Sequence, residues 1–163
     1  MIPIENIHSL NDAWATLIVE ELVRNNVNHF CIAPGSRSTP LTLAAARHPD
    51  VETTVHFDER GLAFFALGLS SITKQPTVLI CSSGTAAANF LPAIIETSKK
   101  KLPLIVLTAD RPFELRDTGA LQTIDQIKLY GNYTRHFTDL PAPDANIKPE
   151  VLLTTVDQAV FRA

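Results

Sequence analysis

The sequence predicts an α/β fold, a three-layer sandwich in which helices cover both faces of a mostly parallel central sheet. Short segments that are apolar throughout alternate along the chain with longer segments whose apolar residues recur at helical spacing. Strands without polar alternation are typical of sheets covered on both faces, and such sheets are parallel because helices connect their strands. The length of 163 residues suits a single domain, and 45% hydrophobic with 19% charged residues excludes a disordered chain.

The first predicted helix begins at the N-cap Ser9 and ends near Asn25. Its apolar residues share one face: Leu10, Trp14, Leu17, Ile18 and Leu22. Residues 29–33 then form a short apolar strand, which ends at Pro34-Gly35-Ser36.

A second helix is predicted over residues 41–47, with Pro40 beside its first turn, where a missing N–H does no harm. The β-branched residues of 51–56 predict the second strand. A third helix follows over 59–72, and its predicted apolar stripe consists of Leu62, Phe65, Ala66, Leu69 and Ile72.

Two further segments, Thr77–Cys81 and Leu104–Thr108, are apolar throughout and predict strands that helices cover on both faces. A helix of small residues over 85–97 connects them. After the long loop 109–122, the sequence predicts three more elements: a short helix at 124–129, an edge strand at 133–140 and an amphipathic helix at 149–161.

Polar residues gather in the loops that follow the predicted strands. Right-handed crossovers bring all strand-to-helix loops to one edge of a parallel sheet, and open α/β sheets bind their ligands at that edge. The loops concerned are 34–40, 57–59, 82–85 and 109–122.

The loop after the first strand has the composition of an anion site. Gly35 permits a tight turn, hydroxyl and amide groups can donate hydrogen bonds, and Arg37 supplies a forked cation. These groups suit a carboxylate or phosphate at a helix N-terminus. An alternative interpretation, a turn whose serines and threonines only cap the helix, accounts for the residues equally well.

The loop after the second strand carries two acids, Asp58 and Glu59, followed by Arg60. A functional interpretation makes one of them a buried acid with a raised pKa. The alternative is a solvated helix start, because the helix dipole favours acids in the first turn.

The loop after the third strand, around Ser83-Gly84-Thr85, resembles an anion-binding junction in outline. It lacks the lysine of a P-loop and the glycine spacing of a dinucleotide-binding fold. Its small residues would let a planar ligand approach closely, and close packing of a helix against the sheet, which we favour, requires the same residues.

The loop 109–122 is too long and polar to be only a connector. Arg111 directly follows a buried strand, and with Arg37 it could form a two-arginine clamp for a polyanionic small molecule. Alternatively, Asp110 and Asp117 could pair with these arginines and neutralise them.

Composition limits the partners and the compartment. A net charge of −3 gives no broad footprint for nucleic acid, and no apolar run reaches the roughly 18 residues of a membrane helix. The first five residues lack a signal-peptide pattern, and Cys31 and Cys81 fit the core of a protein in a reducing compartment, so we expect a cytoplasmic location. The five histidines show no metal-binding spacing, so we assign no metal site within the chain.

At these loops the sequence resembles one enzyme family. Five blocks occur in the family's order: APGSRSTPLTLAAARHP, VHFDERG, SSGTAAANFLPAIIE, LTADRP and DTGALQTIDQ. They resemble the N-terminal part of the 2-succinyl-5-enolpyruvyl-6-hydroxy-3-cyclohexene-1-carboxylate synthases of menaquinone biosynthesis, which are thiamine diphosphate-dependent enzymes. The resemblance covers nearly the whole chain.

The resemblance implies a thiamine diphosphate-binding fold of the pyrimidine type, with residues 1–163 as a single N-terminal domain and a fragment of a three-domain enzyme. That enzyme is a transferase of aldehyde or ketone residues, which decarboxylates 2-oxoglutarate and adds the succinyl carbanion equivalent to isochorismate. It is a homodimer or larger homo-oligomer. We expect the fragment alone to be inactive and to expose an apolar interface.

Residue roles follow from the same resemblance. Glu59 corresponds to the cofactor glutamate, which hydrogen-bonds N1′ of the aminopyrimidine so that the 4′-imine can take the C2 proton. Pro34 and Gly84 correspond to cofactor-binding positions. The matched substrate positions are Ser36, Arg37, Arg111 and Gln122.

The chain departs from the family in few places. Phe113 stands where a second proline is common and Leu121 where we expect a smaller or more polar residue, so both affect the shape of the substrate loop. The Gly-Asp-Gly motif, through which a C-terminal domain binds the diphosphate and Mg²⁺ or Mn²⁺, is absent.

Two alternatives remain. A non-catalytic binding module would keep this fold without the chemistry, although the intact Glu59, Arg37 and Arg111 argue against it. A nucleotide-binding Rossmann domain fits the architecture but not the glycine pattern.

Overall fold

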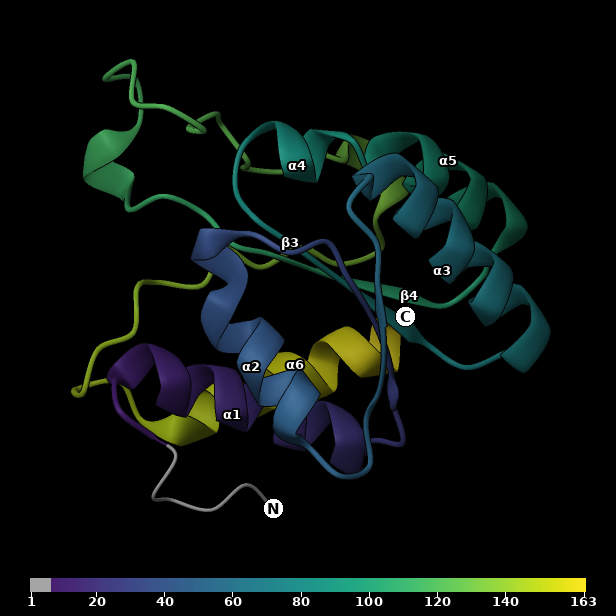
Figure 1. Ribbon diagram of the computed structural model, residues 1–163, viewed down its shortest axis with the longest axis horizontal. Helices are drawn as coiled ribbons and strands as arrows, with labels where there is room; N and C mark the ends of the chain where they lie inside the picture. Colours follow the sequence, from purple (N-terminus) through teal and green to yellow (C-terminus); the bar gives the residue numbers. More distant parts are fainter. Residues whose placement is uncertain (1–6) are drawn as a thin grey trace.

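A four-stranded parallel sheet forms the middle layer of the computed structural model, which describes residues 7–163 (Figure 1). The strand order is β2-β1-β3-β4, and every neighbouring pair is parallel. The strands are β1 (His29–Ile32), β2 (Glu52–Val55), β3 (Thr77–Cys81) and β4 (Leu104–Thr108). The predicted three-layer fold is confirmed; the first five residues, considered above for a signal peptide, lie outside the described part.

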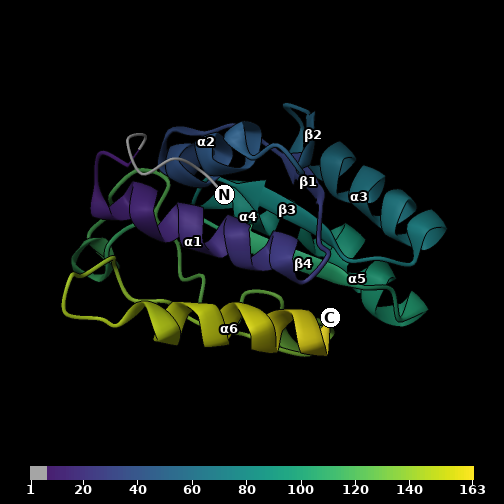
Figure 2. The same ribbon diagram turned by 90° about the horizontal axis from the view of Figure 1, so that it is seen from below.

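Helices cover both faces of the sheet (Figure 2). One face carries α1 (Leu10–Arg24), α2 (Thr39–Arg47) and α6 (Pro149–Arg162), and the other carries α3 (Glu59–Thr73), α4 (Thr85–Ala88) and α5 (Leu91–Lys100). Within the described residues, no helix is long and apolar enough to cross a membrane.

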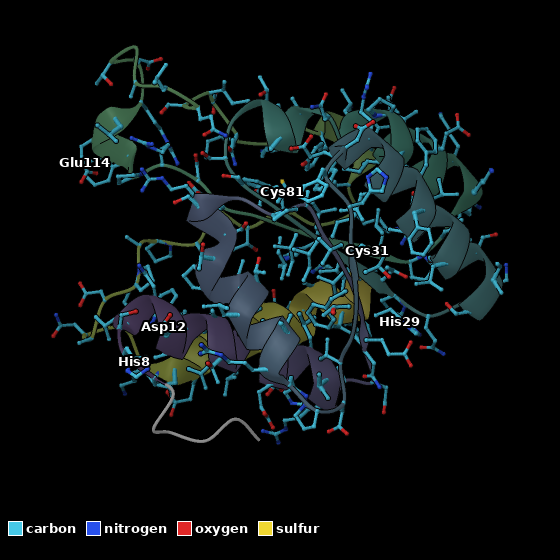
Figure 3. All side chains as sticks on the ribbon, viewed as in Figure 1. His8, Asp12, His29, Cys31, Cys81 and Glu114 are labelled. Carbon is cyan, nitrogen blue, oxygen red and sulfur yellow. The ribbon has the colours of Figure 1, made fainter. Side chains whose placement is uncertain are left out.

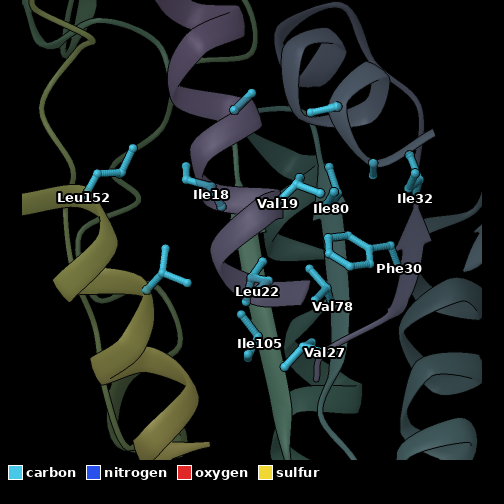
Figure 4. Close-up of a cluster of buried hydrophobic side chains, with 14 residues drawn as sticks. Ile18, Val19, Leu22, Val27, Phe30, Ile32, Val78, Ile80, Ile105 and Leu152 are labelled. Carbon is cyan, nitrogen blue, oxygen red and sulfur yellow. The ribbon is translucent and has the colours of Figure 1, made fainter. Parts of the chain in front are cut away.

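Alternate residues of the strands point into two separate cores. Phe30 and Ile80 face the α1, α2 and α6 side, where Leu22 and Leu152 join them (Figure 4). The strand residues that face the α3 and α5 side are Cys31, Leu79 and Cys81. β3 is buried at all five positions, because both cores cover it.

The N-cap prediction for α1 is confirmed, since Ser9 Oγ accepts a hydrogen bond of 3.1 Å from Asp12 N. The predicted stripe of α3 is wrong at two positions, because Phe65 is 50% exposed and Ile72 is 83% exposed. The helix instead buries a face made largely of small residues, which allows close packing on β3 and α5: Leu62, Ala63, Ala66, Leu67 and Ser70.

The single helix predicted over 85–97 is two helices, α4 and α5, separated at Asn89 and Phe90. Pro92 lies in the first turn of α5, where its missing N–H is tolerated; inside one continuous helix it would remove a hydrogen bond. Phe90, between the two helices, is buried in the core on this side of the sheet.

Two predictions after β4 are wrong. Residues 124–126 are irregular and 127–130 form a turn, because the side chain of Gln126 is held by the neighbouring loops and Lys128 adopts a left-handed φ of 51°. Residues 133–140 form no strand; a short 3₁₀ turn, η4 (Gly131–Tyr133), leads into an extended loop beside β4. β-forming residues alone do not make a strand where the backbone finds no ladder partner.

Candidate functional site

The carboxyl ends of the four strands lie side by side, as the parallel topology predicts. Backbone hydrogen bonds continue the pairing one residue beyond the strands, from Ala33 N to Ile80 O (2.8 Å), from His56 N to Ile32 O (3.1 Å) and from Ala109 N to Cys81 O (3.1 Å). The four loops therefore start from a fixed edge, which is the place where the sequence expected a ligand.

The two acids after β2 have different environments. Asp58 is the N-cap of α3: its carboxylate accepts from Arg60 N at 3.0 Å and pairs with Arg60 Nε at 3.3 Å. The hydrogen bond from the Arg60 side chain, followed by that from its backbone, lowers the pKa of Asp58. Asp58 is exposed, so it is a capping residue and not a buried acid.

Glu59 is half-buried at the first position of α3. Within residues 7–163, its carboxylate has no hydrogen-bond or ion-pair partner among the described side chains. It lies close to the end of β3, because its charge adds to burial in raising the pKa of the Cys81 thiol. One carboxyl without a partner among these residues therefore lies at the start of α3, near the carboxyl end of β3.

The hydroxyl groups after β1 do not cap α2. Ser38 Oγ and Thr39 Oγ1 donate to Gly35 O at 3.1 and 3.5 Å, which closes the 3₁₀ turn η2 (Ser36–Ser38), and no side chain caps the helix. A Cβ on Gly35 would lie 2.5 Å from Ser82 Cβ, so this position requires glycine. The simple capping interpretation is therefore wrong, and Arg37 extends from a rigid turn.

The loop after β3 is held against the end of the long loop 109–122 by two contacts with Gln122. Gly84 has a φ of 76°, and a Cβ there would lie 2.9 Å from the carbonyl oxygen of Gln122. Ser83 Oγ donates to that carbonyl at 2.9 Å. Helix packing alone does not explain these contacts, because they join two loops at the ligand edge.

The side chain of Gln126 connects the loop after β3 to the end of β4. The sequence analysis did not predict a role for this residue. Its Oε1 accepts from Gly84 N at 2.8 Å, while its Nε2 donates to Ala109 O at 3.1 Å and to Thr108 Oγ1 at 3.3 Å. The residue is only 7% exposed. Nothing in the hydrophobic pattern distinguishes it from Gln122, whose side chain is exposed and whose carbonyl makes the contact.

The acids of loop 109–122 do not neutralise its first arginine. Asp110 Oδ1 accepts from the backbone of Arg111 at 2.7 Å, and its Oδ2 accepts from Arg116 Nη2 at 3.3 Å. Arg116 also contacts Asp139 at 3.4 Å. Burial alone would lower the pKa of Arg116, but Asp139 and Asp110 outweigh it, so that the pKa is raised.

Arg111 and Arg37 remain available to an anion. Arg111 Nε is buried without a hydrogen-bond partner, and the described residues give neither guanidinium an ion pair. A buried donor without a partner is costly, which favours a ligand that supplies an acceptor.

A cavity of about 1010 Å³ brings some of the polar groups together. It lies between β4, α1, α6 and the loops after β1 and β4, and its lining includes Ser36, Arg37, Arg111 and Gln126. The predicted residues Pro34, Glu59, Gly84 and Gln122 do not line it. The candidate site thus has two parts, an arginine-lined cavity and the adjacent edge that carries Glu59.

The cysteines take no part in this chemistry. Cys31 and Cys81 are buried free thiols in the middle of the molecule, whereas Glu114 lies on the projecting loop (Figure 3). Burial raises the pKa of Cys31 to about 11. Residues 7–163 also contain no group of three or more histidine, cysteine or acidic side chains that could hold a metal ion.

The chain is similar to known proteins over most of its length. The model of the family "Thiamine pyrophosphate enzyme, N-terminal TPP binding domain" matches residues 13–129. Three relatives carry the name 2-succinyl-5-enolpyruvyl-6-hydroxy-3-cyclohexene-1-carboxylate synthase. The Psychromonas ingrahamii protein is 55% identical over 93% of this chain and 26% of its own length.

The other two are equally similar. The Salinibacter ruber protein is 56% identical over 91% of this chain and 25% of its own length. The Prosthecochloris aestuarii protein is 54% identical over 95% of this chain and 27% of its own length. The chain therefore spans about a quarter of the length of each of these curated relatives.

Proposed function

Because the chain belongs to the thiamine pyrophosphate enzyme family as an N-terminal TPP-binding domain, we propose that it is the pyrimidine-binding part of a longer synthase. That synthase would join the succinyl group of 2-oxoglutarate to isochorismate. The relatives' shared name supports the product, and the two unpaired arginines support substrates that carry several carboxylates.

One observation carries the proposal: the Asp58 carboxylate caps α3, while Glu59, at the edge of the sheet where the strands end, has no partner among the described residues. A carboxyl in this position can hold a proton at N1′ of an aminopyrimidine. Its half-burial restricts water, which a group that transfers protons in a cofactor site requires.

The residues present fit the aminopyrimidine end of thiamine diphosphate. Gly84 lies against the backbone of Gln122 and Gly35 against the side chain of Ser82, where any Cβ would collide, so only glycine fits at these two positions of the edge, and Pro34 precedes Gly35. When bound, the cofactor would supply the group that stabilises the carbanion left by decarboxylation of a 2-oxo acid. We assign the diphosphate and Mg²⁺ or Mn²⁺ to another domain, because the sequence has no Gly-Asp-Gly motif.

The cavity would bind the carbon skeleton of the acceptor. Arg37 and Arg111 would each orient a carboxylate, and Ser36 would donate a hydrogen bond. Gln122, which does not line the cavity, would contact the substrate only from the adjacent loop that lies against Gly84. In this proposal the acceptor would bind in the cavity next to Glu59, and Glu59 itself would contact the cofactor.

The proposal includes a homodimer as the smallest assembly and the cytoplasm as the location. Large apolar side chains near Glu59 support the interface, since Phe57 is 86% exposed and Phe64 and Phe65 are 46% and 50% exposed. Two free buried thiols suit a reducing compartment.

Turnover of the full-length enzyme tests the proposal. Isochorismate consumption is followed with thiamine diphosphate, Mg²⁺ and 2-oxoglutarate, and again with each component left out. We expect consumption only in the complete mixture, and none with the 163-residue chain alone. An enzyme that folds and binds the cofactor but consumes no isochorismate would contradict the proposal and favour a binding module.

A further inference from the structure

The charges on loop 109–122 raise a question that the proposed reaction leaves open. Asp110 and Arg111 are adjacent in sequence at the mouth of the cavity, and opposite charges so placed would normally pair. Such a pair would remove Arg111 as a receptor for a substrate carboxylate. In the structure the side chains of Asp110 and Arg111 form no ion pair, because both carboxylate oxygens of Asp110 have other partners.

Both oxygens of Asp110 are already engaged. Oδ1 accepts the backbone N–H of Arg111 at 2.7 Å, which turns the carboxylate back towards the chain. Oδ2 accepts from Arg116 Nη2 at 3.3 Å. The Asp110 side chain is 23% exposed and that of Arg116 is 31% exposed, so water screens this ion pair only in part.

Arg116 also contacts a second carboxylate, that of Asp139. Asp139, on the extended loop beside β4, accepts from the same Nη2 at 3.4 Å. Arg116 therefore sits between two carboxylates and spans two loops that line the cavity. Within residues 7–163, the Nε–H groups of Arg111 and Arg116 are both buried without a hydrogen-bond partner, but Arg116 has two carboxylates at its Nη2 and the Arg111 guanidinium has none.

We propose that Arg116 is a positioning residue: by engaging Asp110 it keeps that carboxylate away from the Arg111 guanidinium, which stays unpaired for a carboxylate of the substrate. This inference rests on the proposed function. Arg116 need not touch the substrate, because it acts through Asp110.

Removal of the Arg116 charge would release Asp110 as a competitor. In Arg116→Gln the carboxylate of Asp110 loses its cation, and Arg111, the next residue in the chain, carries another guanidinium with which it could pair. We expect the KM for isochorismate to rise roughly five- to twenty-fold, the range for a partly buried ion pair, with kcat within about two-fold of wild type.

A double substitution separates this role from a purely structural one. In Arg116→Gln with Asp110→Asn the competing charge is gone, while the asparagine Oδ1 still accepts from Arg111 N. We expect the KM to return to within about two-fold of wild type, and Arg116→Lys to stay near wild type because it keeps the charge. Arg24→Gln, which removes a remote exposed arginine with an ion pair of its own at 3.6 Å, is the matched control.

The outcomes decide the inference. It is overturned if the full-length wild type turns over but Arg116→Gln leaves KM unchanged, or if adding Asp110→Asn fails to lower the raised KM. A crystal structure of Arg116→Gln gives a readout without turnover: Asp110 should lie within hydrogen-bond distance of the Arg111 guanidinium, and an Asp110 that stays turned away contradicts the inference. If the wild type does not consume isochorismate, the proposed function fails, and the crystal structure still decides the role of Arg116.

Discussion

Gln126→Leu is the substitution that tests the architecture of the candidate site most sharply. The glutamine joins the loop after β3 to the end of β4 through its hydrogen bonds to Gly84, Ala109 and Thr108. Leucine has a similar volume, so the substitution removes polar contacts without leaving a large void. The loop after β3 should then detach from the segment around Gln122.

The magnitude follows from the groups left without partners. The buried Gly84 N–H loses its acceptor, which costs about 1–3 kcal/mol. The two hydrogen bonds donated by Nε2 contribute roughly 0.5–1.5 kcal/mol each. Allowing for the apolar burial that leucine gains, we expect local opening of this loop to become easier by about 2–4 kcal/mol.

Hydrogen exchange followed by mass spectrometry on the full-length enzyme measures this opening. Peptides that contain Gly84 should lose protection by roughly 30-fold or more, since 1.4 kcal/mol corresponds to about tenfold. Gln158→Leu, at an exposed position of α6, is the matched control and should leave these peptides unchanged. Protection within about three-fold of wild type in Gln126→Leu would refute the role assigned to this side chain.

Two further predictions concern stability. Gly84→Ala combines a φ of 76° with a Cβ 2.9 Å from Gln122 O, so we expect a lower Tm and a loss of about 2–4 kcal/mol, whereas Gly119→Ala (φ 75°, nothing within 4 Å) should cost only about 1 kcal/mol. For Glu21, burial and then Asp157 raise the pKa above 4.5, so ionisation destabilises the fold as pH rises through the folded pKa. Glu21→Gln should therefore raise Tm near pH 8, and a gain that persists below about pH 4 would contradict this cause.

The hydrophobic pattern predicted the strands to within one or two residues, because an apolar run such as that of β3 must be covered on both faces wherever it lies. It failed at Phe65 and Ile72, since a helix that packs through alanine and serine can leave larger side chains exposed. It also failed at 133–140, where a strand depends on a partner that no local pattern encodes.

The candidate site was predictable in part. Parallel topology alone brings Arg37, Glu59 and Arg111 to one edge of the sheet. The sequence could not decide which acids engage which arginines, because the answer depends on Arg116, six residues from Asp110, and on Asp139, 23 residues beyond Arg116. Gln126 was missed for a similar reason: burial of an amide between loops has no periodic signature.

The central claim is that Glu59, and not its neighbour, holds the proton at the cofactor ring. The most direct measurement compares Glu59→Gln with Asp58→Asn in the full-length enzyme, by isochorismate turnover and by exchange of the C2 proton of bound thiamine diphosphate into deuterated water. Glu59→Gln should slow both by roughly 10²- to 10⁴-fold, the range for a general acid or base, while Asp58→Asn keeps a capping side chain and should stay within about tenfold of wild type. Equal losses in the two variants, or rapid exchange in Glu59→Gln, would contradict the account.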